Sequence, residues 1–189
     1  MHYFTSEEMT RLLTVSYTQD RLFHLAALVS LSQGLRVTEM RSLTCGDVDG
    51  EYLNVRPLKD GIPHLEPIQR NDSPIFDEGA ISVLVHGLLS QGGNSLTPLF
   101  GLSRQAWDKK MRKMCAMAGI PDTKSHWHAL RHTCGHMVFQ NTVSLGCVSQ
   151  ALRHKSLSSA LAYLHEHDAG RAYSAVSKGL AGLAELAGG

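Results

Sequence analysis

Apolar residues recur at helical spacing along most of the chain. The segment T-S-E-E over residues 5–8 has the residue types of a helix-capping box, and apolar residues three and four positions apart follow it. Residues 22–31 are apolar on nearly every side, which predicts a buried central helix that ends at Gly34. Similar patterns over 78–90 and 103–117 predict further helices. The chain is therefore expected to be mainly α-helical.

One stretch has the pattern of a β-hairpin instead. Residues 52–58 are rich in strand-forming types, Asp60-Gly61 is a two-residue turn signal, and 64–69 form the return strand. Three prolines in this stretch favour an exposed, edge-like hairpin with Lys59 near its tip. The predicted fold class is thus mainly α with a small antiparallel β-hairpin, in a single domain.

Composition sets limits on where such a chain can work. With 189 residues, 43% hydrophobic and 19% charged, the chain has ordinary globular composition. Its four cysteines lack C-x-x-C spacing, so they are expected to be free, buried thiols in a reducing compartment. The N-terminus has no signal-peptide pattern, and the longest apolar stretch is too short to span a bilayer. A cytoplasmic protein without a membrane partner is expected.

Candidate chemistry is concentrated in residues 125–163. His128 and Arg131 are three positions apart, so on a helix they project from one face and can meet one anion. His154 follows further along, and Tyr163 comes nine positions after it, with helix-like sequence in both gaps. A guanidinium, two imidazoles and a phenol around one point are the groups that transfer of a DNA phosphate to tyrosine requires.

This arrangement resembles the tyrosine recombinases, the family of phage integrases, Xer recombinases and fimbrial switch recombinases. That family has an H-x-x-R box, then a His or Trp, then a nucleophilic Tyr at these spacings. The matching positions are His128 with Arg131 in H-A-L-R, His154 in L-R-H, and Tyr163 in A-Y-L-H.

Two further family positions lie upstream, and the resemblance extends over nearly the whole chain. The sequence G-L-R-V-T-E supplies Arg36 and Glu39, and Lys59 matches the family's hairpin lysine. One position departs from the family, because Arg153 stands where a glycine usually precedes the second histidine. Glycine suits a left-handed helix cap and arginine does not, so the geometry of this helix end is left open.

The resemblance implies the recombinase catalytic-domain fold and a site-specific recombinase that cleaves and rejoins DNA through a 3′-phosphotyrosine, without metal or cofactor. Tyr163 would attack the phosphate, while Arg36 and Arg131 hold its non-bridging oxygens. His154 would add a hydrogen bond to the charge that grows in the transition state.

Three further residues complete the implied mechanism. His128 would accept the proton near the nucleophile, and Lys59 would protonate the departing 5′-oxygen. Glu39 is expected to orient Arg36 rather than to react, the alternative being a surface helix residue. Lys59 without the resemblance would be taken for a solvated turn lysine.

The resemblance also implies partners, namely double-stranded DNA, a homotetramer on DNA and possible accessory DNA-bending proteins. The net charge of +1 is low for a DNA-binding protein, so basic residues are expected on one face, or elsewhere in the recombinase. The densest basic segment is expected to follow a DNA backbone, the alternative being a solvated helix face: Arg104, Lys109, Lys110, Arg112 and Lys113.

Domain organisation follows the resemblance as well. Residues 1–189 correspond to the catalytic domain, and nothing corresponds to the family's N-terminal core-binding domain, so the chain is either a fragment or a naturally minimal enzyme. An apolar stripe over residues 170–187 predicts a C-terminal helix. This helix is expected to dock on a neighbouring subunit, with packing on its own domain as the alternative.

The same residues admit three other interpretations. His128, His132 and His136 are spaced as on one helix face, but no carboxylate in the segment completes a hydrolytic zinc site, so His132 and His136 are expected to be packed or hydrogen-bonded. A type IB topoisomerase uses the same covalent chemistry, yet those enzymes generally have Lys where His128 stands. An inactive DNA-binding relative is disfavoured because every expected catalytic residue type is retained.

Overall fold

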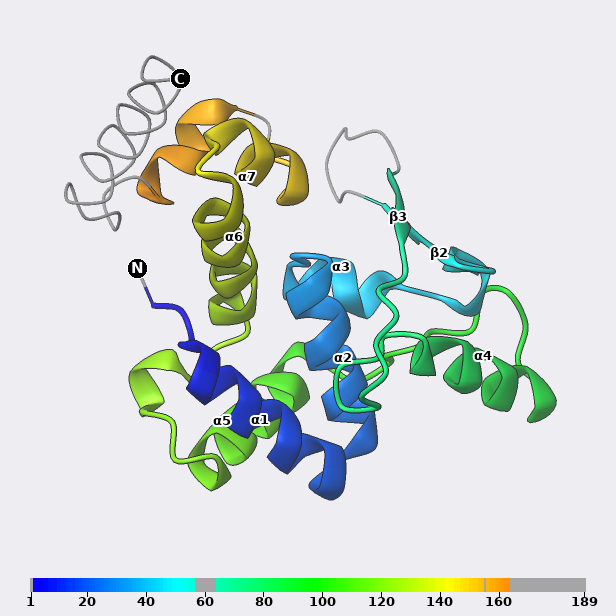
Figure 1. Cartoon of the computed structure of the whole chain (residues 1–189). Coiled ribbons are helices and arrows are strands. Elements are labelled where there is room, and N and C mark those ends of the chain that lie inside the picture. Colours follow the sequence, from blue (N-terminus) through cyan, green and yellow to red (C-terminus); the bar gives the residue numbers. More distant parts are fainter. Residues whose placement is uncertain (1, 57–63, 155, 164–189) are drawn as a thin grey trace, which may run out of the picture.

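Helix α2 (Arg21–Ser32) lies at the centre of the computed structural model, which describes residues 2–56, 64–154 and 156–163 (Figure 1). Every residue of α2 from 23 to 31 is buried, as the apolar run predicted. The helix ends where Gly34 adopts a φ of 57°, a left-handed conformation that costs glycine little. The predicted buried central helix is therefore confirmed.

Helices α1 (Ser6–Gln19) and α5 (Arg104–Met117) pack beside α2 and each other. Both have the predicted side-chain caps, because Thr5 forms a capping box with Glu8 and Ser103 accepts a hydrogen bond from the amide of Ala106. Met117, the last residue of the helix predicted over 103–117, is 46% exposed. It lies in the last turn of the helix.

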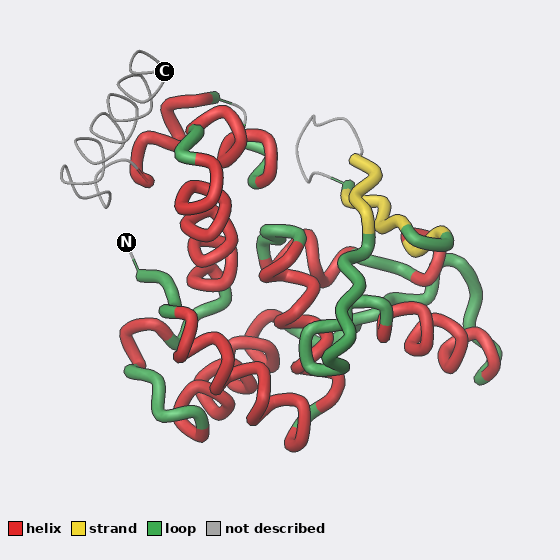
Figure 2. The backbone as a smooth tube through the Cα atoms, viewed as in Figure 1, coloured by secondary structure: helices red, strands yellow, loops and turns green. Residues whose placement is uncertain are grey.

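The sheet has three short antiparallel strands in the order β1 (Val48–Asp49), β2 (Tyr52–Val55) and β3 (His64–Pro67). Tyr52 pairs with Pro67 and Val55 with His64, which confirms the predicted hairpin and adds β1 to it. The turn at Asp60-Gly61 and Lys59 lie outside the described residues. Helix α4 (Ala80–Ser90) lies next to the sheet. Figure 2 shows the strands in yellow beside the red helices.

Helix α6 (His128–Thr142) extends from the layer of α1, α2 and α5 to a small upper group formed by α7 (Leu145–Ala151) and the 3-10 helix η3 (Leu157–Tyr163) (Figure 1). This group has its own apolar cluster, in which Tyr163 packs with Phe139 and Leu152. The helix-like sequence between His154 and Tyr163 forms η3, which is a tighter 3-10 helix rather than an α-helix. The predicted helix over 170–187 lies outside the described residues.

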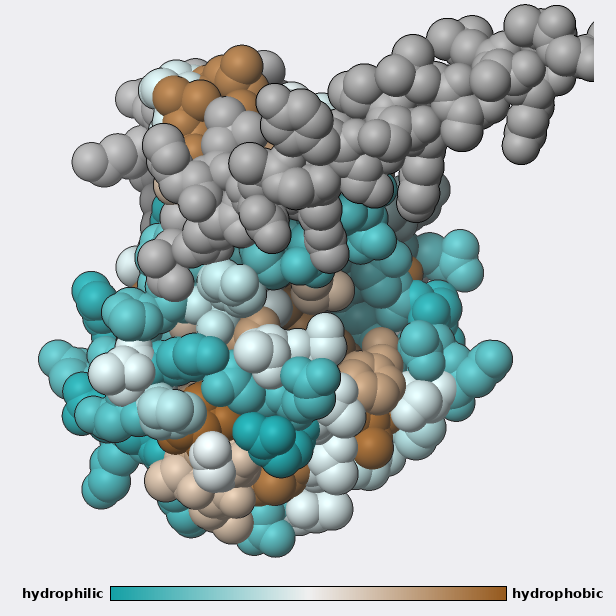
Figure 3. Space-filling view, turned by 60° about the vertical axis from the view of Figure 1, so that its left-hand side comes forward, coloured by the Kyte–Doolittle hydropathy of each residue, from teal (hydrophilic) through white to brown (hydrophobic). Residues whose placement is uncertain are grey.

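Shorter elements connect these parts: α3 (Val37–Ser42) and the 3-10 helices η1 (Cys45–Asp47) and η2 (Asp122–Lys124). Cys45, Cys115 and Cys134 are free and buried as expected, whereas Cys147 on α7 is exposed, contrary to expectation. The lower part of the face in Figure 3 is mainly hydrophilic, and apolar residues appear there in small patches. Within the described ranges, no helix combines the length and apolarity needed to cross a membrane.

Candidate active site

Arg36 begins the site because the turn after α2 places it at the N-cap of α3. Glu39, one turn along, accepts two hydrogen bonds from Arg36, one from the backbone amide at 2.8 Å and one from Nη1 at 2.8 Å. The Glu39 side chain is buried, while that of Arg36 is 45% exposed. A charge-assisted pair with one open partner fixes the guanidinium and leaves donors free for an anion.

Arg131 on α6 is buried against the same carboxylate. Its Nη1 lies 3.9 Å from Oε2 of Glu39 and donates to the carbonyl of Gly34 at 2.5 Å, and its Nη2 donates to the carbonyl of Leu152. Burial, followed by the charge of Arg36, lowers the pKa of Arg131 to about 10, although Glu39 opposes that shift. The group stays protonated at neutral pH, so two guanidiniums share one carboxylate.

His154 lies just beyond the end of α7, after Arg153. Arg153 has a φ of 50°, and this turn closes with hydrogen bonds from its amide to Gln150 at 3.0 Å and from the amide of His154 to Ser149 at 2.8 Å. The helix end is therefore left-handed, as a glycine would make it, despite the arginine. The buried Nδ1 of His154 has no hydrogen-bond partner in the part of the chain that the structure describes.

The two predicted histidines share an electrostatic environment with the two arginines. Burial, then the charges of Arg131, Arg36 and His128, lowers the pKa of His154 to about 4. Burial also lowers the pKa of His128, with Arg131 and Arg36 among the further causes. Both imidazoles are thus kept neutral at neutral pH in the absence of an anion, and each can donate or accept one hydrogen bond per nitrogen.

Tyr163, at the end of η3, is 2% exposed and lies against α6. Its ring covers Gly135 so closely that a Cβ atom added there would lie 2.5 Å from Cζ of the tyrosine. Its hydroxyl lies 3.3 Å from Nδ1 of His132, and its charge also influences the pKa of Arg131. The phenol therefore lies against α6, with its hydroxyl beside His132.

Four of the six predicted catalytic positions form one electrostatic cluster, the hydroxyl of Tyr163 lies 3.3 Å from Nδ1 of His132, and Lys59 is outside the described residues. His132 was expected to be packed or hydrogen-bonded, and it does lie at hydrogen-bond distance from Tyr163, but the sequence assigned it no role toward the nucleophile. Its position one turn after His128 was the available signal. The sequence interpretation identified Arg153 as a departure but assigned it no function.

Comparison with known proteins identifies the family. The model of the phage integrase family matches residues 2–169, which is most of the chain. The chain belongs to this family. A tyrosine recombinase XerD of Brucella abortus is 29% identical over 139 residues, covering 70% of this chain and 44% of that protein. The chain thus spans less than half the length of the curated relatives it matches.

Solved structures have the same fold. XerA recombinase superposes with a TM-score of 0.71 at 22% identity, covering 94% of this chain and 64% of that one. XerH bound to difH substrate superposes with a TM-score of 0.71 at 19% sequence identity, covering 94% of this chain and 54% of that one. The catalytic domain of bacteriophage HP1 integrase superposes with a TM-score of 0.62 at 18% sequence identity, covering 87% of this chain and 88% of that one. These likenesses confirm the predicted catalytic-domain fold.

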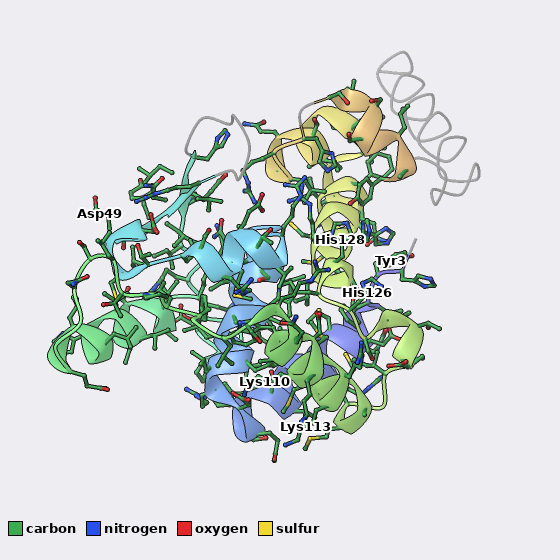
Figure 4. The ribbon with its side chains drawn as sticks, turned by 180° about the vertical axis from the view of Figure 1, so that it is seen from behind. Tyr3, Asp49, Lys110, Lys113, His126 and His128 are labelled. Atoms are coloured by element: carbon green, nitrogen blue, oxygen red, sulfur yellow. The ribbon has the colours of Figure 1, made fainter. Side chains whose placement is uncertain are left out.

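In this phage integrase family member, the basic residues of α5 lie apart from the site. Arg104, Lys109, Arg112 and Lys113 are exposed, whereas Lys110 bonds to Asp20. Figure 4 shows Lys110 and Lys113 at the lower end of the molecule, away from His128. A DNA contact by α5 would therefore be distant from the arginine pair.

Three histidines of α6, at positions 128, 132 and 136, contact other rings. The rings of His128 and His132 meet edge to face with centroids 4.4 Å apart, and His136 stacks on Tyr3 at 4.0 Å. Figure 4 shows His126 and His128 near Tyr3. Among the residues that the structure describes, no group of three or more His, Cys, Asp or Glu side chains could hold a metal ion.

Proposed function

We propose that this chain is the catalytic domain of a site-specific DNA recombinase that cleaves and rejoins strands through a 3′-phosphotyrosine. The observation that carries the proposal is the buried carboxylate of Glu39 between the guanidiniums of Arg36 and Arg131. Two neutral histidines lie in their field, and the hydroxyl of Tyr163 lies 3.3 Å from His132, the residue that follows Arg131. These are the groups that phosphoryl transfer to tyrosine needs.

In the proposed reaction the oxygen of Tyr163 attacks phosphorus, and the bond from phosphorus to the 5′-oxygen breaks. Arg36 and Arg131 hold the non-bridging oxygens, and His154 donates a hydrogen bond to the developing charge. A phenol has an ordinary pKa of about 10, so a neighbouring base must accept its proton. His128 and His132 are the two neutral imidazoles available for that step.

The reaction also needs an acid for the leaving 5′-oxygen and a rearrangement of the nucleophile. We propose that Lys59 protonates the oxygen, as the resemblance implies. Because Tyr163 is buried against α6, η3 must shift before the phenol can reach a phosphate on the exposed side of Arg36. The enclosed tyrosine would keep the free protein from cleaving DNA.

Double-stranded DNA is the proposed partner, since lambda integrase, which has a similar fold, was solved bound to DNA. Assembly as a homotetramer on DNA, with accessory DNA-bending proteins, extends the same proposal. The activity would operate in the compartment that holds the DNA, which for a mobile element is the cytoplasm or nucleoid of its host.

The deciding experiment traps covalent complexes on a pool of nicked duplexes with randomised sequence. Wild-type protein should form an adduct that resists denaturant and selects particular sequences. Tyr163→Phe removes only a hydroxyl, so it should form none while folding and binding DNA normally. Failure of the wild type to form any adduct would refute the proposal, and adducts without sequence preference would favour a topoisomerase.

A further inference from the structure

We infer that Arg153 is a positioning residue. It fixes the end of α7, next to His154, against the turn that leads to Arg36. The inference rests on the proposed function, because it assigns a role toward the phosphate site described above. Arg153 itself is not expected to touch DNA, since its side chain is only 5% exposed. It would act by positioning His154, which follows α7, and Arg36, which follows the turn after α2.

The backbone of Arg153 is the first reason to look for such a role. Among described non-glycine residues, only Val143 and Arg153 have positive φ, at 51° and 50°. Residues with a Cβ atom rarely adopt this conformation because the Cβ crowds the carbonyl oxygen. Arg153 is therefore held in an unfavourable backbone state at the residue next to His154, and its side-chain contacts help to offset the cost of that state.

Those contacts reach two other elements. Nη2 of Arg153 donates to the carbonyl of Gln33, at the end of α2, at 2.6 Å, and Nη1 lies 3.3 Å from Oε1 of Glu66 on β3. A weaker bond at 3.4 Å joins Nη1 to the carbonyl of Ala151 in its own turn. One guanidinium thus connects the end of α7 to α2 and to the hairpin.

Arg131 completes a matching pair of clamps. It donates to the carbonyl of Gly34, the residue after Gln33, and to that of Leu152, the residue before Arg153. The two arginines therefore bind successive carbonyls in the turn that leads to Arg36. A shift of this turn relative to α7 would move Arg36 and His154 apart, so Arg153 fixes the spacing of two groups proposed to hold one phosphate.

The test compares two glycine substitutions. Arg153→Gly removes the clamp and relieves the backbone, whereas Val143→Gly relieves the same conformation at an exposed helix end. On duplexes recovered from the wild-type trapping experiment, Arg153→Gly should lower the cleavage rate by roughly 10- to 100-fold through misplacement, with DNA affinity unchanged. Val143→Gly should cleave at the wild-type rate.

Arg153→Lys should not rescue cleavage, because one ammonium cannot reproduce the planar fork that reaches both Gln33 and Glu66. Cleavage by Arg153→Gly at the wild-type rate would overturn the positioning role. An equal loss in Val143→Gly would also overturn it, since the effect would then come from helix-end flexibility. Wild-type adduct formation, measured in parallel, reports on the proposed function separately.

A second measurement needs no DNA. The amide of His154 donates to Ser149 at 2.8 Å and that of Leu35 to Ser30 at 2.9 Å, so hydrogen exchange monitors both clamped segments. Both amides should exchange at least about tenfold faster in Arg153→Gly and at wild-type rates in Val143→Gly, because local opening governs their exchange. Unchanged protection of both amides in Arg153→Gly would refute the clamp, even if no DNA were cleaved.

Discussion

Nδ1 of His132 lies 3.3 Å from the hydroxyl of Tyr163, and the ring of His132 in turn contacts that of His128. Burial, followed by the charge of His128, lowers the pKa of His132 to about 4. At neutral pH the imidazole is therefore uncharged and has an unprotonated ring nitrogen, although its low pKa makes it a weaker base than an ordinary histidine. The candidate nucleophile is thus adjacent to a base that the H-x-x-R box does not include.

Replacement of His132 should slow formation of the tyrosine adduct. His132→Phe keeps an aromatic ring but cannot accept a proton, and loss of a general base typically lowers the rate by about 100-fold or more. His132→Gln can still hydrogen-bond, so near-normal cleavage by this variant alone would indicate orientation rather than proton transfer. Single-turnover adduct formation measures both, and wild-type rates in both variants would remove His132 from the reaction.

Gly135→Ala should disturb the seat of Tyr163. The added methyl would lie within 2.6 Å of the phenol oxygen, and overpacking of this kind typically lowers the free energy of unfolding by about 1–3 kcal/mol. The tyrosine should also become more accessible to a nitrating reagent. Gly87→Ala on α4 is the control, because no atom lies within 4 Å of its added Cβ and alanine favours the helix by roughly 0.5–1 kcal/mol. Equal stability of the two variants in urea unfolding would contradict the close packing.

Arg36→Lys and Arg131→Lys should both lose cleavage activity, but they should differ in their effect on the free energy of unfolding. Loss of the bidentate grip should slow adduct formation on the order of 100- to 1000-fold in each variant. Arg131 is buried on two backbone carbonyls, so Arg131→Lys should also lower the free energy of unfolding by about 1–3 kcal/mol. The side chain of Arg36 is half exposed, so Arg36→Lys should change the free energy of unfolding by less than about 1 kcal/mol. Rapid cleavage by either variant would exclude that arginine from the site.

The exposed basic side chains of α5 should contribute to DNA affinity rather than to chemistry. If Lys109, Arg112 and Lys113 each bind a DNA phosphate, every replacement by Gln should reduce the slope of log affinity against log salt by about 0.9. Lys110→Gln is the matched control, because Lys110 is paired with Asp20 and its replacement should leave the slope unchanged. Titrations at several salt concentrations measure both, and an unchanged slope in the triple variant would separate α5 from DNA.

Acid should destabilise the fold through its buried histidines. Burial lowers the pKa of His24 to about 4 from 6.5, so between these values the unfolded chain binds a proton that the folded chain does not. The free energy of unfolding should therefore fall as pH is lowered through this window, and His132 and His154 add to the effect. Glu78 opposes this effect. Burial raises the pKa of its carboxyl group, so just above the ordinary value of 4.5 the folded chain binds a proton that the unfolded chain does not. Urea unfolding of His24→Gln should show a flatter pH dependence, and a slope equal to the wild type would contradict the assignment.

Elements with local signals could be predicted from the amino-acid sequence alone. The capping residues Thr5 and Ser103, the apolar run of α2 and the paired strands each depend on neighbours a few positions away, or on alternation along one strand. The spacing of His128 and Arg131 on one helix face is local in the same sense. Hence the fold class and the candidate residue types could be predicted before any contact was known.

How these residues meet depends on the packing of the folded chain. Arg131 bonds to Gly34, 97 positions away, and Arg153 bonds to Gln33, 120 positions away. Tyr163 is enclosed because η3 folds back on Gly135, which no spacing along the chain reveals. Helical periodicity reports which face of an element is apolar, but not which segment packs on that face. The paired clamps of Arg131 and Arg153 and the seat of the nucleophile therefore follow from tertiary packing, because each joins segments that no local pattern relates.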